Sequence, residues 1–389
     1  MGWLKADATD PVVSLRDLPV FCNALYPTAA EAMAAPRGDL ELRFSPSTGY
    51  LWNDAFDPDL VAYNPAYENS LHYSPRFQDF ARDLADRLIE RYDLRDRRIV
   101  EIGSGEGNFL ALLCERGGNR GVGYDPSFDP GRSKVVTSAQ MEIVRQYYPT
   151  DRPIDASLVL CQHVLEHVTD PAGLVEGVRA SIPDDAATAV YFEVPDATYM
   201  VSELAVWDLI YEHLSYFSAP TLQHLFERAG FEVVEVDRTF GDQYLYLEAR
   251  PRRHGTPAPA PAPDTAALTK LAERVAAFGE HFDRLRRLWS QRLTAMLADG
   301  PVAVWGAGSK GVSFLNLVQG GDTVQHVVDI NPNKWGLHLP GTGQPVVGPD
   351  ALAGSGVRNV VVMNPLYVEE IAAQVRSLGV DAEVTAVSD

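Results

Sequence analysis

A strand-like run that ends in three glycines is the part of this sequence that points most directly to a ligand. Arg98 to Ile102 is mostly apolar, and the residues that follow are Gly103-Ser104-Gly105-Glu106-Gly107. A helical run then begins at Asn108. Glycines permit a tight turn and let backbone N–H groups approach a ligand at the start of a helix. Glu101 stands at the strand end, where a carboxylate attracts a cationic amino group and repels a pyrophosphate.

A second acidic residue favours the same ligand. Asp125 follows a predicted strand at 121–124 and lies 24 residues after Glu101, and such a carboxylate can accept both hydroxyls of a ribose. A third predicted strand runs into Gln162 and His163. Together the three elements resemble the class I S-adenosylmethionine-dependent methyltransferases. That resemblance implies S-adenosyl-L-methionine as the cofactor, held by Glu101, Gly103, Ser104, Gly105, Asn108, Asp125, Pro126, Gln162 and His163. The alternative is a turn that binds another nucleotide or no ligand.

The stretch from 206 to 218 carries the residue types that could do the chemistry. Methylation at carbon requires a base that removes a proton next to a carbonyl group. His213 has a suitable unperturbed pKa, near 6.5. Glu212 could orient it, and Tyr211 could polarise the carbonyl group. The alternative is a buried structural histidine.

The run from Tyr211 to Ser218, followed by Leu222, Leu225 and residues 229–234, resembles the C-methyltransferases of antibiotic deoxysugar pathways. Those enzymes methylate a nucleotide-linked keto sugar and carry an Ile-Tyr-His-Glu-His run before a Tyr-Phe pair. The resemblance implies that Glu212 and His213 lie in the active site, with His213 as the base. The family's tyrosine falls on Ile210 and its middle histidine on Tyr211. The residues from 240 to 249 also differ from the family pattern, and these differences leave the acceptor open.

A second glycine-rich turn follows a Pro/Ala-rich segment. Val302 to Gly311 is a strand followed by GxGxxG spacing, and Asp329 ends the next predicted strand. Spacing alone would fit a dinucleotide, but the surrounding residues resemble the C-terminal domain of the same C-methyltransferases. That resemblance implies a domain that encloses a nucleotide-linked acceptor; the alternative is a fold used only for packing. The substrate-binding candidates are Tyr67, Tyr73, Glu193, Tyr216, Gly306, Gly308 and Lys310.

No metal site is expected. The resembled family begins with a four-cysteine zinc module, whereas this sequence keeps Cys22 and has serines in 44–49 where a Cys-x-x-Cys pair would stand. Serine is a poor zinc ligand compared with a thiolate. His163, Glu166 and His167 could suggest a metal, but no further ligand cluster follows them, so a structural role is favoured.

These residues need elements to position them. Apolar strand-like runs alternate with amphipathic segments, which predicts an α/β fold with a mostly parallel, doubly wound sheet. We expect a class I methyltransferase Rossmann-like domain, a second C-terminal Rossmann-like domain and a small, less regular N-terminal lobe. The expected boundaries are 1–65 for the lobe, 66–250 for the methyltransferase domain, 251–265 for the Pro/Ala linker, and 266–389 for a helix with the second domain.

Composition restricts the partners. The 389 residues include 33 Lys and Arg against 53 Asp and Glu, a formal net charge of −20. Because a phosphate backbone requires clustered basic residues, no nucleic-acid partner is expected. No apolar run of about 20 residues and no apolar leader segment is present, so neither a membrane partner nor export is expected, and the cytoplasm is the expected location. The three cysteines are far apart and predict no disulfide framework.

The sequence therefore predicts a methyltransferase that acts on a small-molecule acceptor, at carbon through an enolate formed by His213. The acceptor is expected to be a nucleotide-linked keto sugar or a similar carbonyl compound. Three alternatives stay open: an O- or N-methyltransferase on the same scaffold, an NAD-binding oxidoreductase that uses the Gly306 turn, and a binding protein without activity.

Overall fold

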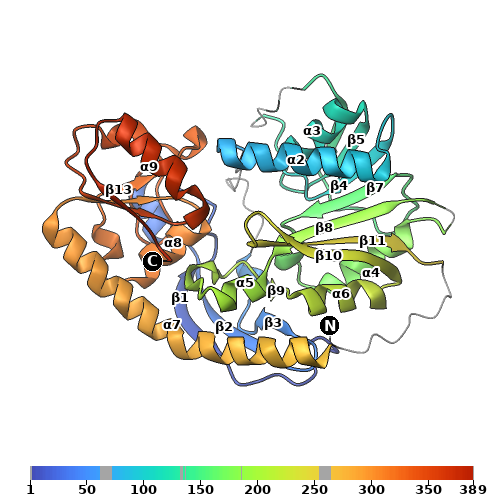
Figure 1. Ribbon diagram of the computed structural model, residues 1–389, viewed down its shortest axis with the longest axis horizontal. Helices are drawn as coiled ribbons and strands as arrows, with labels where there is room; N and C mark the ends of the chain where they lie inside the picture. Colours follow the sequence, from blue (N-terminus) through green and yellow to red (C-terminus); the bar gives the residue numbers. More distant parts are fainter. Residues whose placement is uncertain are drawn as a thin grey trace.

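The computed structural model describes residues 2–61, 72–131, 135, 137–184, 186–253 and 264–388. Tyr67 and the Pro/Ala-rich residues 254–263 lie outside them. The described chain contains a seven-stranded, a five-stranded and a four-stranded sheet. Figure 1 shows the seven-stranded sheet and the five-stranded sheet in separate bodies, with the N-terminal strands between them.

The seven-stranded sheet belongs to the segment 66–250, which the sequence predicts to be the methyltransferase domain, and has the order β10-β11-β8-β7-β4-β5-β6. The pairs from β8 to β6 are parallel, whereas β10 and β11 form an antiparallel edge. β4 is buried at Ile99, Val100 and Ile102, as a central strand with helices on both faces requires. Its strands are β4 (Arg98–Ile102), β5 (Arg120–Tyr124), β6 (Gln140–Val144), β7 (Leu158–Gln162), β8 (Ala189–Pro195), β10 (Phe231–Thr239) and β11 (Tyr244–Pro251).

Four of the helices that cover this sheet lie where the sequence predicts them, whereas α5 (Ala197–Ser202) and the strand β6 were not predicted. Their starts are marked by capping residues: the Ser74 side chain caps α2, and the Asp170 side chain caps α4, each satisfying an otherwise unpaired N–H group. The helices are α2 (Pro75–Tyr92), α3 (Asn108–Gly117), α4 (Pro171–Ser181), α5 (Ala197–Ser202) and α6 (Ala219–Arg228).

The C-terminal sheet is parallel throughout and has the order β14-β13-β12-β15-β16. Its strands are short apolar runs that are buried at the centre, as in β12 and β15. This is the second Rossmann-like unit that the sequence predicts. Its elements are β12 (Val302–Trp305), α8 (Ser309–Leu317), β13 (His326–Val328), β14 (Val346–Val347), β15 (Asn359–Val362), α9 (Val368–Ser377) and β16 (Glu383–Ala386).

The N-terminal lobe is more regular than the sequence suggests. Its antiparallel sheet has the order β1-β2-β3-β9, and buried and partly buried residues alternate along β2. The fourth strand comes from the other end of the methyltransferase domain, where Leu51 and Trp52 pair with Tyr216 and Ser215. The expectation of an irregular lobe was wrong because this distant strand completes its sheet. The elements are β1 (Val13–Pro19), α1 (Ala29–Met33), β2 (Arg37–Ser45), β3 (Tyr50–Asn53) and β9 (Ser215–Tyr216).

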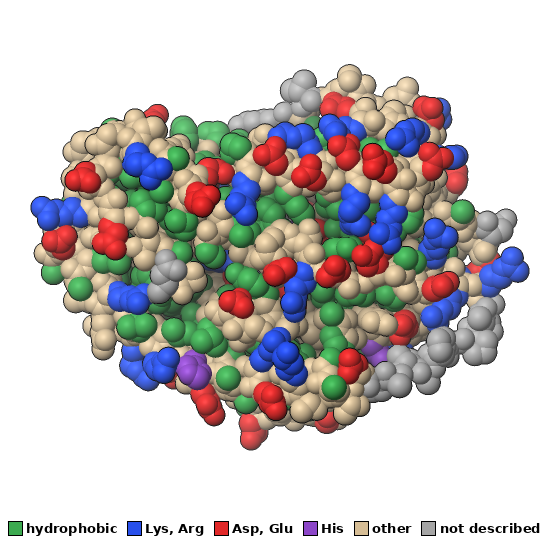
Figure 2. Space-filling model, viewed as in Figure 1, with side chains coloured by type: hydrophobic (Ala, Val, Ile, Leu, Met, Phe, Trp, Pro, Cys, Tyr) green, Lys and Arg blue, Asp and Glu red, His purple; other side chains and the backbone are tan. Residues whose placement is uncertain are grey.

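One long helix, α7 (Thr265–Asp299), joins the two larger domains. At 35 residues it is about 50 Å long, and Figure 1 shows it passing under the N-terminal strands towards the C-terminal sheet. Its buried stripe shares one hydrophobic core with the lobe and the C-terminal domain. Figure 2 shows acidic and basic side chains interspersed on the visible face. No helix among the described residues is long and apolar enough to cross a membrane.

Candidate active site

A cavity of about 350 Å³ lies between the methyltransferase domain and the C-terminal domain. The methyltransferase domain contributes histidines, carboxylates and tyrosines, whereas the C-terminal domain contributes a glycine-rich turn and lysines. We call these two linings the methyltransferase wall (His163, Glu166, His167, His213, Tyr244) and the C-terminal wall (Gly306, Gly308, Lys310, Lys334).

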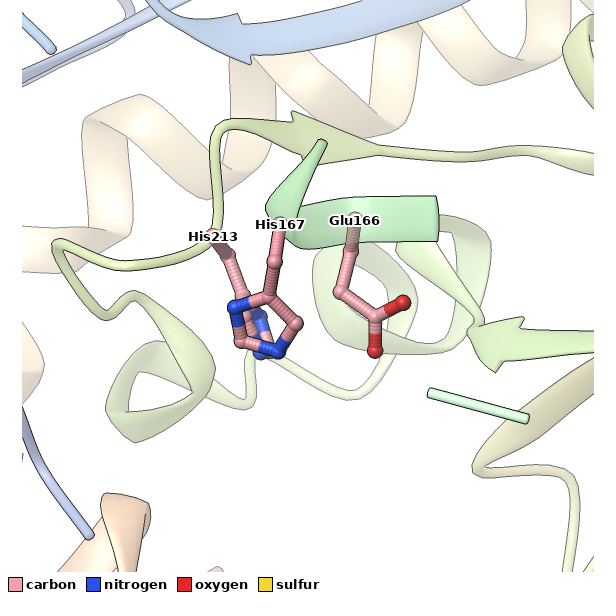
Figure 3. Close-up of side chains that lie close together, drawn as sticks. All are labelled: Glu166, His167 and His213. Carbon is pink, nitrogen blue, oxygen red and sulfur yellow. The ribbon is translucent and has the colours of Figure 1, made fainter. Parts of the chain in front are cut away.

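Two histidines and a carboxylate meet on the methyltransferase wall. Glu166 and His167 come from a single 3₁₀ turn, η2 (Leu165–His167), and His213 comes from the segment before β9. Figure 3 shows the three side chains extending in the same direction from these two segments. The His167 and His213 rings are 4.8 Å apart between centroids. Burial, and then the neighbouring His167, lowers the pKa of His213 to about 3, so its ring is neutral and keeps a free lone pair.

His163 lies beside this group. Its backbone is left-handed, with φ 54°, and its Nε2 lies 3.2 Å from Oε1 of Glu193. Its Nδ1 lies 3.6 Å from Oε1 of Glu166. Burial opposes the charge, but the two carboxylates outweigh it and raise the pKa of His163 to about 10. The structure places His163, which was predicted to bind the cofactor, in the lining of the cavity as a cation.

The same carboxylate cluster explains two further predicted residues. Glu193 is 1% exposed, does not line the cavity, and accepts hydrogen bonds from the Tyr191 hydroxyl at 2.7 Å and from Gln162 Nε2 at 3.1 Å. Glu193 was predicted to bind substrate and Gln162 to bind the cofactor. Glu193 pairs with the His163 cation, and Gln162 orients the Glu193 carboxylate, because a buried cation requires a carboxylate nearby.

Glu212 and Tyr211 do not share the catalytic position predicted for them. Oε1 of Glu212 accepts the backbone N–H of Cys22 at 3.0 Å, and the Tyr211 hydroxyl accepts the backbone N–H of Asp57 at 2.8 Å. Both side chains thus point into the N-terminal lobe, and neither lines the cavity. The adjacent residues Glu212 and His213 thus face different ways: Glu212 contacts the N-terminal lobe, whereas His213 lines the cavity.

The C-terminal wall carries two lysines, each beside an aspartate. Nζ of Lys310 lies 2.8 Å from Oδ1 of Asp208 in η3 (Val206–Asp208), and Nζ of Lys334 lies 3.1 Å from Oδ2 of Asp329. Asp329 also accepts the N–H of Ala307 at 3.0 Å. In a dinucleotide site the acid at this strand end binds ribose hydroxyls. Here the carboxylate is paired with the ammonium group of Lys334, a partner that the acid of the first turn lacks in the described part of the chain, and this pairing disfavours the NAD interpretation.

The other predicted cavity residues are held by neighbours. Gly306 and Gly308 line the cavity as predicted, together with Tyr73 and Tyr216. The Tyr73 hydroxyl accepts a hydrogen bond from Nδ2 of Asn333 at 3.0 Å. The Tyr216 hydroxyl donates a hydrogen bond to the Ile210 carbonyl at 3.1 Å. Sequence reasoning missed several further lining residues, for which alternation and spacing give no signal. They are Tyr244, Tyr367, Gln243, Asn364 and Lys334.

The first glycine-rich turn lies outside this cavity and fits S-adenosylmethionine on its own features. Glu101 is 4% exposed, and its Oε2 has no hydrogen-bond partner among the described residues. Burial, and then Asp125, raises its pKa to about 8. A cationic amino group would satisfy this carboxylate. The Oδ2 of Asp125 accepts the N–H of Gly105 at 2.8 Å, which holds the turn beside the acid expected to bind ribose.

The glycines of this turn are required by its geometry. Gly103 has φ 67°, and a Cβ there would lie 2.2 Å from Cγ2 of Val164. Gly105 has φ 53° and faces open space, with nothing within 4 Å of a Cβ. Ser104 is beside them with a buried hydroxyl that has no described partner. Asn108 begins α3 and Pro126 follows Asp125. The turn thus offers backbone and unpaired polar atoms to a ligand.

Two protein families and a relative of known name match parts of this chain. Residues 73–236 match the family described as a methyltransferase domain, and residues 262–382 match the C-methyltransferase C-terminal domain. The chain is 28% identical to the C-methyltransferase NovU of Streptomyces niveus over 70% of this chain and 68% of that protein.

Solved structures resemble the chain over less than half its length. One is the 1,6-didemethyltoxoflavin-N1-methyltransferase of Burkholderia thailandensis, with 18% identity, 46% and 81% of the two chains covered, and a TM-score of 0.35. Another is the magnesium protoporphyrin IX methyltransferase of Synechocystis PCC 6803, with 14% identity, 45% and 83% coverage, and a TM-score of 0.36. From the two family matches and the NovU relative, this chain is an S-adenosylmethionine-dependent methyltransferase that carries a C-methyltransferase C-terminal domain.

Proposed function

We propose that this enzyme methylates carbon in a carbonyl-bearing small molecule that is linked to a nucleoside diphosphate. The observation that carries the proposal is the cavity between the domains, which places a neutral histidine on one wall and a glycine-rich turn with lysines on the other. The relative NovU is named a C-methyltransferase, which supports carbon as the methylated atom.

His213 acts as the base. Burial lowers its pKa to about 3 rather than the 6.5 expected, which keeps the lone pair available but makes the ring a weaker base. Glu166 therefore has to stabilise the imidazolium that forms after proton uptake, and it stands close enough to do so. Removal of the proton next to the carbonyl group leaves an enolate. When bound, S-adenosylmethionine supplies an electrophilic methyl group to that carbon. Glu101, the 103–107 turn and Asp125 are the residues that would hold it.

The C-terminal wall holds the diphosphate. The N-terminus of α8 presents backbone N–H groups after Gly308, which favours an anion. Lys310 has a flexible, part-exposed ammonium group that can turn from Asp208 to a phosphate. The α8 N-terminus, with Lys310 turned from Asp208, would accommodate an anionic acceptor in a protein whose net charge is −20.

Deuterium distinguishes methylation at carbon from methylation at oxygen or nitrogen. A nucleotide-linked keto sugar labelled at the carbon next to its carbonyl group is incubated with enzyme and S-adenosylmethionine, with an enzyme-free sample to correct for exchange. Mass spectrometry of the product shows loss of the deuterium if a C–H bond is replaced by a C–methyl bond. Retention of the label in a methylated product would contradict the proposal.

The base is tested by His213→Ala. Turnover is expected to fall at least about 100-fold, the usual contribution of a general base, while S-adenosylmethionine affinity stays unchanged. His224→Ala, on α6 and outside the cavity, is the matched control and keeps normal turnover. Near-normal turnover of the His213 variant would show that another group takes the proton.

A further inference from the structure

The histidine and carboxylate group on the methyltransferase wall has the composition of a metal site. The Glu166 carboxylate and the imidazole nitrogens of His167 and His213 offer ligand atoms that all lie within 4.8 Å of one another. This is a different set from the one that the sequence suggests, because His163 faces the opposite oxygen of Glu166. We propose that Glu166, His167 and His213 bind a divalent transition-metal ion, and that this ion and the acceptor exclude one another.

The orientation of His167 supports ligation. Its Nδ1 lies 3.0 Å from the backbone carbonyl of Glu212. Because a carbonyl oxygen only accepts, Nδ1 carries the hydrogen, and Nε2 of the neutral ring keeps its lone pair. Histidine ligands of metal ions commonly have their second nitrogen bonded to a backbone carbonyl in this way.

Glu166 supplies the charge. Its side chain is 2% exposed, and its Oε2 has no hydrogen-bond partner among the described residues, which is costly for a buried carboxylate. Its other oxygen, Oε1, lies 3.6 Å from Nδ1 of His163. His163 thus orients Oε1, and Oε2 is left available to bind a cation. A cation at Oε2 would remove the cost.

The geometry needs a modest adjustment. Zinc lies about 2.0–2.2 Å from nitrogen and oxygen ligands, so two ligand atoms at the tetrahedral angle are roughly 3.4 Å apart. Atoms within 4.8 Å of one another would therefore have to approach by up to about 1.4 Å, which side-chain rotations can supply. Two imidazoles and one carboxylate suit Zn²⁺, Co²⁺ and Ni²⁺, and the cavity side of the group leaves coordination positions open.

An ion at this site inhibits the enzyme. Coordination takes the lone pair with which His213 would accept the proton, and it places the ion where the acceptor must lie. This consequence rests on the proposed function, whereas binding of the ion does not. The two can therefore be measured separately.

The test is a titration of the full chain, free of any affinity tag, with Co²⁺ and observation of its visible absorption. We expect one saturable equivalent in the wild type and at least tenfold weaker binding in His167→Asn and in Glu166→Gln. His224→Asn is the matched control and binds as the wild type does. If neither site variant folds, Zn²⁺ must still inhibit wild-type methyl transfer competitively with acceptor, and EDTA must restore it.

Two results would overturn the inference: no saturable Co²⁺ binding by the wild type, or equally tight binding by both folded site variants. These results are distinct from failure of the proposed function. A protein that methylates a keto sugar but binds no Co²⁺ refutes only the metal site. A protein that binds Co²⁺ through these side chains but methylates no carbonyl compound refutes only the function.

Discussion

The two glycine-rich turns of this enzyme share a backbone plan but differ in charge. Each follows a buried strand, opens a helix and faces an aspartate at the end of the neighbouring strand: Asp125 beside residues 103–107, and Asp329 beside residues 306–311. In the first turn a buried glutamate, Glu101, has an unpaired oxygen. In the second, Val304 occupies the corresponding strand position, and Lys334 pairs with the aspartate.

The side chains around each turn set the charge of the ligand that it would suit. The first turn has a buried carboxyl group with an unpaired oxygen, and the ionised form of this group suits the cationic amino group of S-adenosylmethionine. In the second, the acid is neutralised, and Lys310 and the α8 N-terminus favour an anion. Because the backbone pattern is common to both, glycine spacing alone could not separate a cofactor turn from an acceptor turn.

The largest effect that would test this comparison is on stability. Lys334→Met leaves Asp329 buried without its cation, and unfolding in urea should require about 3 kcal/mol less free energy. The pair has side chains only 7% and 12% exposed, so solvent cannot replace the lost contact.

Lys310→Met is the matched control for that variant. Its partner Asp208 and Lys310 itself are about a quarter exposed, and removal of such a pair costs about 1 kcal/mol or less. An equal loss of unfolding free energy in the two lysine variants would show that the Lys334–Asp329 pair adds no more stability than an exposed pair. The contrast between the two turns would then be wrong.

A smaller effect is expected at the first turn. Glu101→Gln removes the charge but keeps the size of the side chain, and it should weaken S-adenosylmethionine binding roughly 30-fold, the value of a charged hydrogen bond of about 2 kcal/mol. Isothermal titration calorimetry measures the affinity. Glu90→Gln, on the exposed side of α2, should bind like the wild type. Unchanged affinity in the Glu101 variant would remove the distinction between the turns.

The smallest expected effect is the release of a proton from Glu101 when S-adenosylmethionine binds. Burial and Asp125 raise the pKa of Glu101 to about 8, so the carboxyl group is mostly protonated at pH 7 without cofactor. The cofactor's ammonium group stabilises the ionised form. Binding at pH 7 should therefore release roughly nine-tenths of a proton, and affinity should fall as the pH falls below 8.

Calorimetry in buffers with different ionisation enthalpies measures that release. The Glu101→Gln variant should release none through this group, whereas Glu90→Gln should match the wild type. A wild-type protein that takes up no proton and releases none at pH 7 would show that Glu101 is already ionised before the cofactor arrives.

Local sequence signals predicted the two Rossmann-like sheets well. β4 begins and ends at the predicted residues, Arg98 and Ile102, because an apolar strand bounded by charged residues and glycine has clear limits. β6 was missed because its residues are only partly buried at the sheet edge and lack an apolar run. The lobe was misjudged because β9 pairs with it across more than 160 residues, which no local pattern reports.

The candidate site was predicted only in part, for a related reason. His213 was identified from its type and surroundings, but its neighbours Glu212 and Tyr211 turn into the lobe. Sequence adjacency says nothing about which side of the backbone faces a cavity in an irregular segment. Glu166 and His167 were seen in the sequence, yet their meeting with His213 depends on tertiary packing.

The pairing of β9 with β3 has a consequence for engineering this enzyme. Because the strand that follows His213 belongs to the N-terminal sheet, the proposed base is positioned by a different sheet from the one beside the proposed cofactor turn. A chimera that exchanges only the methyltransferase domain would import a catalytic loop without the sheet that shapes it. Recombination should therefore keep residues 13–53 and 206–218 from the same parent, as one inherited unit.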